Sequence, residues 1–305
     1  MTDRQIYRKA VSIGAGREAA LNLVLLKRQL KDAATIGYAR ALTPVLKKNG
    51  YQYLIDKSYV VRSIHGFLEE TTKTPIPGAR LNRRFYAGYG LNRQKLGALA
   101  RGGHFHQGLL FCFPLCCNLN FCRKASLQGK GFVDILKEWI VSLPCVSPGE
   151  AGVKSVDYRL IGGVLKYLQP IRVVQHIPCS ACCAESVKLA ERNLALLREI
   201  EPSFYRQARL EFLRPVFLYG NDWNTVGILQ LGRLKKIKKN VFSGRVSAAT
   251  DVRIRKGMTL TIRLVPHKGI EISSPASVLL RESSSRRIPW SYCCLFPSDT
   301  LAKKT

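Results

Sequence analysis

Apolar and polar residues alternate along several short stretches, and this pattern predicts a mainly β chain. Alternation with a period of two is clearest at 241–246, 252–254 and 259–265, and a similar pattern occupies 51–63. Short apolar runs of strand length add four further expected strands, at 104–113, 156–161, 171–177 and 210–219. We therefore expect a single jelly-roll-like antiparallel β domain at the centre of the chain.

Two segments show the helical spacing instead. Leucines recur every three or four positions within 17–36, which predicts a helical N-terminal extension ending near Gly37. The stretch 185–200 is amphipathic and ends before Pro202, so we expect one amphipathic helix inserted into the β domain.

Other stretches carry no regular pattern. Residues 71–103 contain Gly, Pro and five Arg, which predicts an irregular basic segment, and the Ser-rich text from Pro275 predicts a loose tail. The expected organisation is a basic, partly helical region at 1–103, a β core at 104–274 and a flexible polar tail at 275–305. The longest apolar run, 109–117, is broken by Pro114, so no transmembrane helix is expected. We also see no signal-peptide pattern, and together these observations favour a soluble intracellular protein.

The net charge of the chain says more about its expected partner than its hydrophobic content does. The 305 residues carry 49 Lys+Arg against 20 Asp+Glu, a formal net charge of +29, although 46% of the residues are hydrophobic. Residues 1–131 have 22 − 6 = +16 and residues 233–305 have 16 − 4 = +12, whereas 132–232 have only 11 − 10 = +1. Such a folded polycation is typical of proteins that bind a polyanion, with nucleic acid as the first expectation and an anionic membrane as the second.

Two stretches combine charge with the features of a single-strand binder. Aromatic residues are interleaved with Arg and Lys at 80–101, and a basic run begins at 233; Lys and Arg can follow phosphates while Tyr or Phe stacks on bases. We therefore expect nucleic-acid contacts from Arg83, Arg84, Arg93, Lys95, Arg101, Arg233, Lys235, Lys236, Lys238, Lys239, Arg245, Arg253, Arg255 and Lys256.

Cysteines form two groups in the sequence. Cys112, Cys116, Cys117 and Cys122 make up the first, and the second contains Cys179, Cys182 and Cys183. Thiolates on short turns suit tetrahedral zinc, but these spacings match no zinc-binding pattern and the groups are about sixty residues apart. Buried thiols are the favoured interpretation, and zinc, lipidation and redox chemistry stay open as alternatives. No metal site and no cofactor are therefore expected.

Enzymatic signatures are weak. Gly88–Gly90 and Gly102–Gly103 lack the Lys-Ser/Thr ending of a nucleotide-binding loop. His104 and His106 would share one face of a strand, yet no acidic partner is evident. We expect a protein that is not an enzyme.

The order of motifs in the central region is more specific. Trp139 precedes Leu143-Pro144, Gly152-Val153 follows, and Asp157 stands two residues before Arg159, so both side chains project to one face and can pair. As an ordinary ion pair on an edge strand it would have little energetic weight. Ile171–Val174, the helix at 185–200 and a strand around Glu211 complete the series, which resembles the core of the 30-kDa superfamily of plant-virus cell-to-cell movement proteins.

The resemblance implies a function without catalysis. It implies cooperative binding of single-stranded RNA without sequence preference and transport of that RNA from cell to cell through plasmodesmata. It also implies association with endomembranes and plasmodesmal components, a location in the host cytoplasm, and Trp139, Asp157, Arg159 and Glu211 as motif residues. Other copies of the same chain are a further possible partner, in a homo-oligomer. The alternatives are a capsid or nucleocapsid packaging protein and, in a third class, an RNA-processing enzyme or organellar ribosomal protein.

Overall fold

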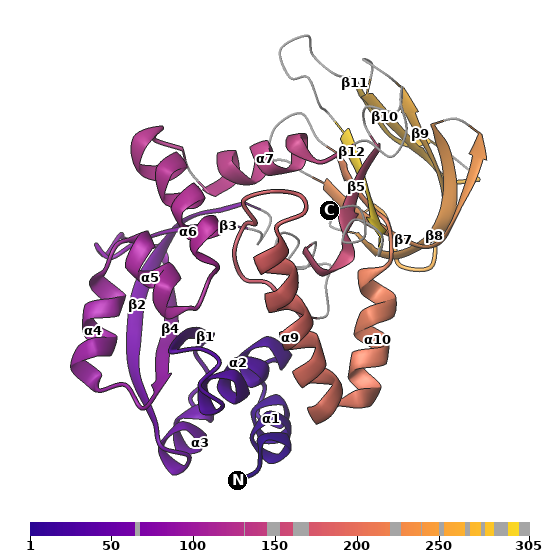
Figure 1. Cartoon of the computed structure of the whole chain (residues 1–305). Coiled ribbons are helices and arrows are strands. Elements are labelled where there is room, and N and C mark those ends of the chain that lie inside the picture. Colours follow the sequence, from indigo (N-terminus) through magenta and orange to yellow (C-terminus); the bar gives the residue numbers. More distant parts are fainter. Residues whose placement is uncertain are drawn as a thin grey trace.

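The computed structural model (Figure 1) describes most of the chain. The described residues are 1–64, 68–130, 132–144, 153–160, 171–219, 227–238, 240–249, 253–265, 269–275, 278–283 and 292–298. They form two sheets joined by a central group of helices, and Figure 1 shows the sheets at opposite ends of the molecule.

The first sheet, sheet A, is antiparallel and lies near the N-terminus. Its strands are ordered β1 (Ala33–Gly37), β4 (Arg80–Tyr89), β2 (Tyr51–Ile64) and β3 (Leu68–Thr72). Phe85 of β4 pairs with Ile36 of β1 on one side and with Ile55 of β2 on the other, which fixes the register of these three strands.

Helices cover both faces of sheet A. On one face, Ala34, Ile36 and Phe85 enter a core shared with α1 (Asp3–Ser12), α2 (Arg17–Lys27) and α3 (Leu42–Lys48). On the other, Ala33 and Leu54 pack with Leu96 of α4 (Arg93–Arg101) and with Leu110 at the end of α5 (His104–Leu110). Helices therefore pack on both faces of sheet A, while Ile55 and Leu81 of its strands remain 45% and 39% exposed.

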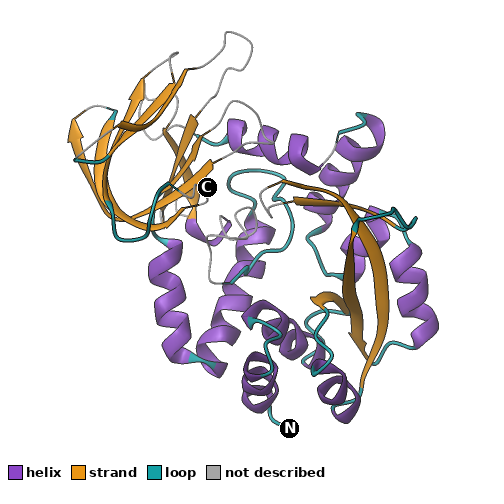
Figure 2. Cartoon of the chain, turned by 180° about the vertical axis from the view of Figure 1, so that it is seen from behind, coloured by secondary structure: helices purple, strands orange, loops and turns teal. Residues whose placement is uncertain are grey.

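A second group of helices connects the two sheets. It comprises α6 (Leu115–Cys122), the π-helical turn η1 (Arg123–Leu127), α7 (Phe132–Ser142), α9 (Ala184–Ile200) and α10 (Pro202–Phe212). Figure 2 shows α10 turning back beside α9. Leu194, Leu197 and Ile200 of α9 belong to the same core as the N-terminal helices, so the neutral middle of the sequence packs directly on the basic N-terminal part.

The second sheet, sheet B, is larger and strongly curved (Figure 2). Six strands form an antiparallel meander in chain order, and the last strand, β12, lies between β6 and the parallel edge strand β5. The strands are β5 (Val153–Asp157), β6 (Val216–Tyr219), β7 (Gly227–Lys238), β8 (Val241–Ala249), β9 (Thr259–Val265), β10 (Gly269–Ser273), β11 (Val278–Ser283) and β12 (Tyr292–Ser298).

Sheet B has a hydrophobic cluster of its own. Phe242 and Val246 of β8 face inward with Leu260 and Ile262 of β9, while Ser243, Arg245 and Thr261 face outward. Gly244 lies on the inward face because a Cβ there would stand 3.2 Å from the Leu231 side chain. The alternation predicted for 241–246 and 259–265 is confirmed, as are the strand at 51–63 and the helix at 185–200.

The expected fold class is only partly confirmed. Both sheets are mostly antiparallel, but helix (43%) exceeds strand (28%), so the fold is mixed α/β rather than mainly β, and a jelly roll is not shown. Residues 71–103 are not an irregular segment, since they contain β4 and α4. Gly88 is a packing residue of β4, because a Cβ there would lie 2.9 Å from Leu91 Cδ1 and 3.1 Å from the Asp32 carbonyl oxygen.

Four strand predictions in the centre are wrong, wholly or in part. Residues 104–110 form α5, and 171–177 are irregular although Ile171 and Val174 are buried. Of 210–219 only the end is a strand, and at 156–161 β5 ends at Asp157. The helix predicted at 17–36 ends at Lys27 and is followed by β1, residues 253–254 lie in a turn, and the tail predicted to be loose contains β11 and β12.

Candidate functional site

The structure divides the predicted nucleic-acid residues between two surfaces. One belongs to sheet A and consists of Arg83 and Arg84 on β4 with Arg93, Lys95 and Arg101 on α4. The other belongs to sheet B, with Arg233, Lys235, Lys236 and Lys238 on β7, Arg245 on β8, and Arg253, Arg255 and Lys256 in the connection to β9. Lys239 lies outside the described residues.

The outward face of β7, β8 and β9 aligns cationic and hydroxyl side chains in cross-strand rows. Lys235 pairs with Ser243, which pairs with Thr261; Lys238 pairs with Val241, which pairs with Arg263. Arg245 lies two residues beyond Ser243 and therefore on the same face. We call Lys235, Lys238, Arg245 and Arg263, all exposed, the basic face of sheet B.

Two irregularities in β7 increase the exposure of its lysines. The register shifts between Gly232 and Lys235 and again between Lys236 and Lys238, so β7 has one more residue than β8 at each place. A β-bulge of this kind bends the strand and increases its twist. All four residues at 235–238 are exposed as a result, including Ile237 at 54%.

The basic residues of sheet A have closer neighbours. The Arg83 guanidinium lies 5.7 Å from the centre of the Tyr38 ring, and Tyr38 itself stacks on Phe85. Arg84 pairs across the sheet with Asp56, whose carboxylate accepts a hydrogen bond from Lys73. Part of the positive charge of this surface is thus matched locally by rings and carboxylates.

Asp157 and Arg159 form the predicted pair, in a more buried position than predicted. Arg159 Nε donates to Asp157 Oδ1 at 2.8 Å and Nη2 donates to Oδ2 at 2.5 Å, while the Arg159 backbone N–H also donates to Oδ1. The Asp157 side chain is 1% exposed and that of Arg159 10%, and Nη1 reaches Glu191 on α9. Hydrogen bonding from Asp157 raises the pKa of Arg159 despite its burial. The pair is therefore buried and hydrogen-bonded, unlike the exposed ion pair of an ordinary edge strand.

The other two motif residues have different surroundings from those implied by the resemblance. Trp139 is buried on α7, in the main core. Glu211 lies on α10 rather than on a strand, where its carboxylate pairs with Arg214 and its carbonyl accepts a hydrogen bond from Gln230. The structure does not bring Trp139, Asp157 and Glu211 together as one site through any described hydrogen bond.

The two cysteine groups, separated in the sequence, meet in space. The Sγ atoms of Cys116, Cys117, Cys179 and Cys183 all lie within 4.8 Å of one another, and we call these four residues the thiol cluster. Cys117 Sγ is 3.5 Å from Cys183 Sγ, and Cys116 Sγ is 3.7 Å from it. Sequence separation was thus a poor reason to treat the groups as independent.

Helix ends and a buried polar network surround the thiol cluster. Cys116 and Cys117 lie in the first turn of α6, and Cys183 is the residue that precedes α9. Hydrogen bonding from Cys117 and from Ser186 lowers the pKa of Cys183, whereas the hydrogen bond with Cys183 and burial raise that of Cys117. Burial lowers the pKa of His176 to about 3, so its ring is neutral where it meets Ser186 Oγ at 2.8 Å.

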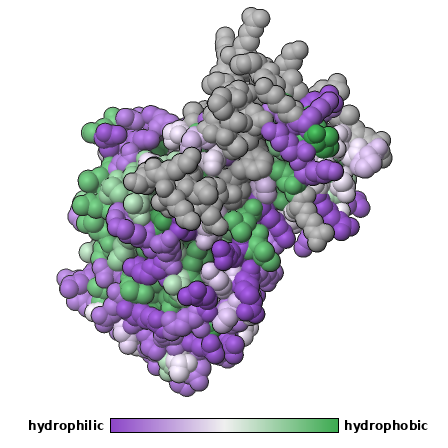
Figure 3. All heavy atoms as spheres, turned by 45° about the vertical axis from the view of Figure 1, so that its right-hand side comes forward, coloured by the Kyte–Doolittle hydropathy of each residue, from purple (hydrophilic) through white to green (hydrophobic). Residues whose placement is uncertain are grey.

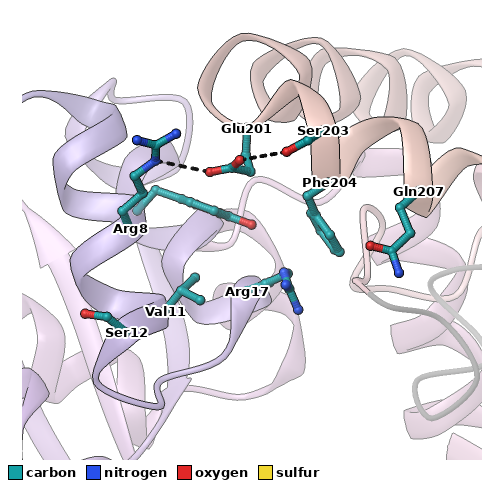
Figure 4. Close-up of a pocket in the computed structure, with 9 residues that line it drawn as sticks. Arg8, Val11, Ser12, Arg17, Glu201, Ser203, Phe204 and Gln207 are labelled. Atoms are coloured by element: carbon teal, nitrogen blue, oxygen red, sulfur yellow. Dashed lines mark hydrogen bonds and ion pairs between the residues drawn. The ribbon is translucent and has the colours of Figure 1, made fainter.

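A cleft lies between α1, the start of α2 and α10 (Figure 4). The Glu201 carboxylate accepts hydrogen bonds from Arg8 Nε at 3.3 Å and from Ser203 Oγ at 3.1 Å. Arg17 lies over the Phe204 ring, 4.2 Å from its centre. The polar groups of this cleft thus bind one another and hold α10 against the N-terminal helices.

His104 and His106 do not share one face. They lie two residues apart on the helix α5, where such neighbours point in different directions, and both are exposed. His104 packs edge-on against Phe121, and His106 against Phe105. Neither contact is that of a general base held by a carboxylate.

Surface hydrophobicity and helix length are the two features that bear on contact with a membrane. Figure 3 shows a mostly hydrophilic face with hydrophobic atoms gathered toward its left-hand edge. Among the described helices, none combines the length and the apolar character that crossing a bilayer requires.

Sequence reasoning missed Arg263, His176 and Ser186. The alternation of 259–265 was a usable signal for Arg263, because it places this arginine on the polar face of the expected strand. No local pattern identifies Ser186 or His176, since their partners come from other parts of the chain.

Comparisons with models of protein families, with curated proteins and with solved structures were made for the whole chain. None of the three found a match.

Proposed function

We propose that the chain binds single-stranded nucleic acid through the basic face of sheet B and carries viral RNA from cell to cell through plasmodesmata. The observation that supports binding is the cross-strand alignment of Lys235, Lys238, Arg245 and Arg263 beside the hydroxyls of Ser243 and Thr261. Such a face can follow a phosphate backbone with ionic contacts and hydrogen bonds, without reading bases.

The positions of further cations also support the basic face of sheet B as the binding surface. Arg245 Nε donates to the Gly257 carbonyl oxygen at 3.0 Å, which holds this side chain at the edge of the connection containing Arg255 and Lys256. Both are exposed. The described cations extend from the β7–β8 hairpin to the β8–β9 connection, which lie at the two ends of β8, so a bound strand would run along β8.

Fewer observations support the proposed role in transport. It rests on the order of the motifs and on the buried Asp157–Arg159 pair, since the segments expected to be strands around Glu211 and at 171–174 are not strands. In this proposal the protein acts in the host cytoplasm, at endomembranes and at plasmodesmata.

Nucleic-acid binding is tested by salt titration of a single-stranded RNA oligonucleotide, followed by fluorescence polarisation. The variant K235Q/K238Q/R245Q/R263Q removes the four cations of the basic face. If all four contact phosphates, the slope of log K against log salt falls by about 3, because each contact contributes about 0.7 for a single strand.

A control with the same loss of charge separates this face from the net charge. Lys9, Lys47, Lys48 and Arg206 are exposed and lie on helices outside sheet B. Their simultaneous change to Gln is expected to alter the slope by less than about 1. Equal slopes for the two quadruple variants would remove the basic face from the proposal, and circular dichroism checks that both remain folded.

Transport is tested separately, with a fluorescent fusion in leaf epidermis. We expect puncta at cell walls and movement of a transport-deficient reporter virus into neighbouring cells. Regular particles or rings with RNA in electron micrographs, without such puncta, would instead indicate a packaging protein.

A further inference from the structure

We propose that Cys116, Cys117, Cys179 and Cys183 bind one zinc ion as a closed, structural four-thiolate site. The inference is independent of RNA binding and transport. It rests on the arrangement of the thiol cluster, which brings together two cysteine groups about sixty residues apart in the sequence.

The distances match a tetrahedron around zinc. A Zn–S bond of about 2.3 Å implies about 3.8 Å between any two sulfurs of a tetrahedral site. The observed Sγ–Sγ distances are 3.9 Å for Cys116–Cys117, 3.7 Å for Cys116–Cys183 and 3.5 Å for Cys117–Cys183. Cys179 completes the set, since all four sulfurs lie within 4.8 Å of one another.

This arrangement fits neither a disulfide nor ordinary core thiols. A disulfide needs two sulfurs about 2.05 Å apart, which uses them in pairs, whereas Cys183 Sγ has two thiol neighbours at nearly equal distances. Core thiols are surrounded by apolar side chains, but Cys116 is exposed and Cys179 is half-buried. Four sulfurs around a common centre are the donor set that zinc prefers.

Local donors favour thiolates at Cys117 and Cys183, although the hydrogen bond with Cys183 and burial raise the pKa of Cys117, and burial raises that of Cys179. Cys116 and Cys117 lie in the first turn of α6 and Cys183 immediately precedes α9, so two helix N-termini face the sulfurs with their partial positive charge. The Cys179 backbone N–H donates to Cys117 Sγ at 3.3 Å, and Ser186 Oγ donates to Cys183 Sγ at 3.3 Å. These contacts stabilise thiolates whether or not a metal is bound.

Residues behind the sulfurs hold them in place. Ser186 Oγ also lies 3.2 Å from Cys117 Sγ and 2.8 Å from His176 Nε2, and all three side chains are buried. Such outer contacts orient metal ligands and are a general feature of metal sites. His176 and Ser186 are therefore positioning residues.

Zinc binding releases protons without a redox change, and it links two parts of the fold. One Zn²⁺ replaces the four thiol protons, which pass to solvent, and forms four Zn–S bonds with no redox change. With four protein ligands no position is left for water or substrate, which is typical of structural zinc. The ion would join α6, which packs beside sheet A, to α9 in the central core.

The first test uses the full-length wild-type protein, expressed in zinc-supplemented medium and purified anaerobically in the presence of a phosphine reductant. Elemental analysis is expected to find about one zinc per chain, and X-ray absorption to find four sulfur neighbours at about 2.3 Å. Replacing zinc by cobalt should give the intense visible bands of a tetrahedral cobalt thiolate. Folded protein with less than about a tenth of an equivalent of metal, with iron, or with a disulfide in this cluster would overturn the proposal.

Matched cysteine variants locate the ion. C117S and C183S change members of the cluster, while C122S and C182S change neighbouring cysteines outside it. We expect the first two to lose at least about tenfold in zinc affinity, measured by competition with a chelator, and the second two to lose none. If C117S does not fold, the wild-type metal content and the thiols released by chelator still decide the outcome. Loss of zinc in C122S or C182S, with retention in C183S, would contradict the assignment.

Discussion

Sheet A and sheet B handle positive charge in opposite ways. Around sheet A and the helices packed on it, several cations are paired with carboxylates: Arg28 binds Asp3 and Glu199, Arg172 binds Glu18, and Lys73 binds Asp56. On sheet B the described cations of the basic face project outward from a meander whose other face is a hydrophobic cluster. The same excess of Lys and Arg therefore serves cohesion in one region and is available for a ligand in the other.

Coverage of the sheets explains this difference. Sheet A has helices on both faces, and the cations near it include Arg83, which lies near the Tyr38 ring, and exposed residues of α4. Sheet B has one face turned to solvent, and the four cations of the basic face are exposed there. Net charge alone consequently does not locate a binding surface. The sheet face that is not covered by helices does.

The largest expected effect concerns Arg159, a cation at the boundary between the central helices and sheet B. Changing Asp157 to Ala leaves the buried guanidinium without its main partner, and we expect the free energy of unfolding to fall by about 3–5 kcal/mol. Chemical denaturation of the two proteins measures the change.

An exposed pair on α9 provides the control for this prediction. Lys188 and Glu185 form an ion pair whose side chains are 69% and 57% exposed, and Glu185→Ala should cost less than about 1 kcal/mol. The double variant D157A/R159M should be more stable than D157A, because it removes the unpaired charge as well. Similar losses for D157A and E185A would contradict the importance of burial. Any loss of transport in D157A must be judged against this loss of stability.

The second effect concerns Lys31, which is buried, whereas the lysines on β7 are exposed. Its ammonium is surrounded by the Asn22 and Gln175 oxygens, and burial lowers its pKa to about 8; Glu18 and Cys112 oppose this shift, while Arg172 and Arg192 add to it. Between about pH 8 and 10.5 the unfolded chain holds a proton that the folded chain lacks, so stability rises with pH. Below pH 8 this contribution is a constant penalty.

Lys31→Met removes the penalty and preserves the stem of the side chain. At pH 7 we expect a gain of roughly 1–3 kcal/mol, and the gain should shrink as the pH rises from 8 to 10.5. Gln175 still donates to Asn22 at 3.3 Å, so these amides keep a partner. Lys47→Met, at an exposed position, should show no such pH dependence; the same profile for both variants would refute buried Lys31 as its source.

The smallest expected effect concerns the cations of sheet A. The variant R83Q/R93Q/K95Q/R101Q removes as many charges as the sheet B variant, from exposed positions on β4 and α4. Stability should change by less than about 1 kcal/mol, and the salt slope of RNA binding should fall by less than for K235Q/K238Q/R245Q/R263Q. A larger fall for the sheet A variant would reverse the comparison.

The sequence predicts elements well where periodicity is long and local. Strand β9 and helix α9 were expected within one or two residues of their ends, because burial on one face imposes a period of two or 3.6. The pairing of Asp157 with Arg159 was also expected, since it depends on two side chains of one short segment.

Predictions fail where distant contacts decide the structure. Residues 104–110 are apolar enough for a strand but form a helix, with Gly108 against Asn118: a Cβ on this glycine would lie 2.1 Å from Asn118 Oδ1. The run at 171–177 is apolar because it crosses the core, yet Asn193 on α9, rather than a neighbouring strand, donates to the Val173 carbonyl. Short apolar runs do not distinguish these environments.

The candidate sites show the same limit. Alternation places Arg245 and Arg263 on a polar face, but only the register of β8 with β9 puts them beside the lysines of β7. The spacing of the cysteines along the chain argued against a common site. The packing of α6 near the start of α9 nevertheless brings four of them together. Burial of Asp157 depends likewise on helices far along the chain.

The position of β12 has a consequence for the order in which the protein can assemble. Cys294 of β12 pairs with Val153 of β5 and with Phe217 of β6, so this strand separates two that are made much earlier. At about 5–20 residues per second, the roughly 140 residues between 153 and 294 take the ribosome about 7–30 s to add. Throughout that interval β5 lacks the strand neighbour it has in the finished sheet, so this edge is exposed to the cell's chaperones and proteases until synthesis is nearly over.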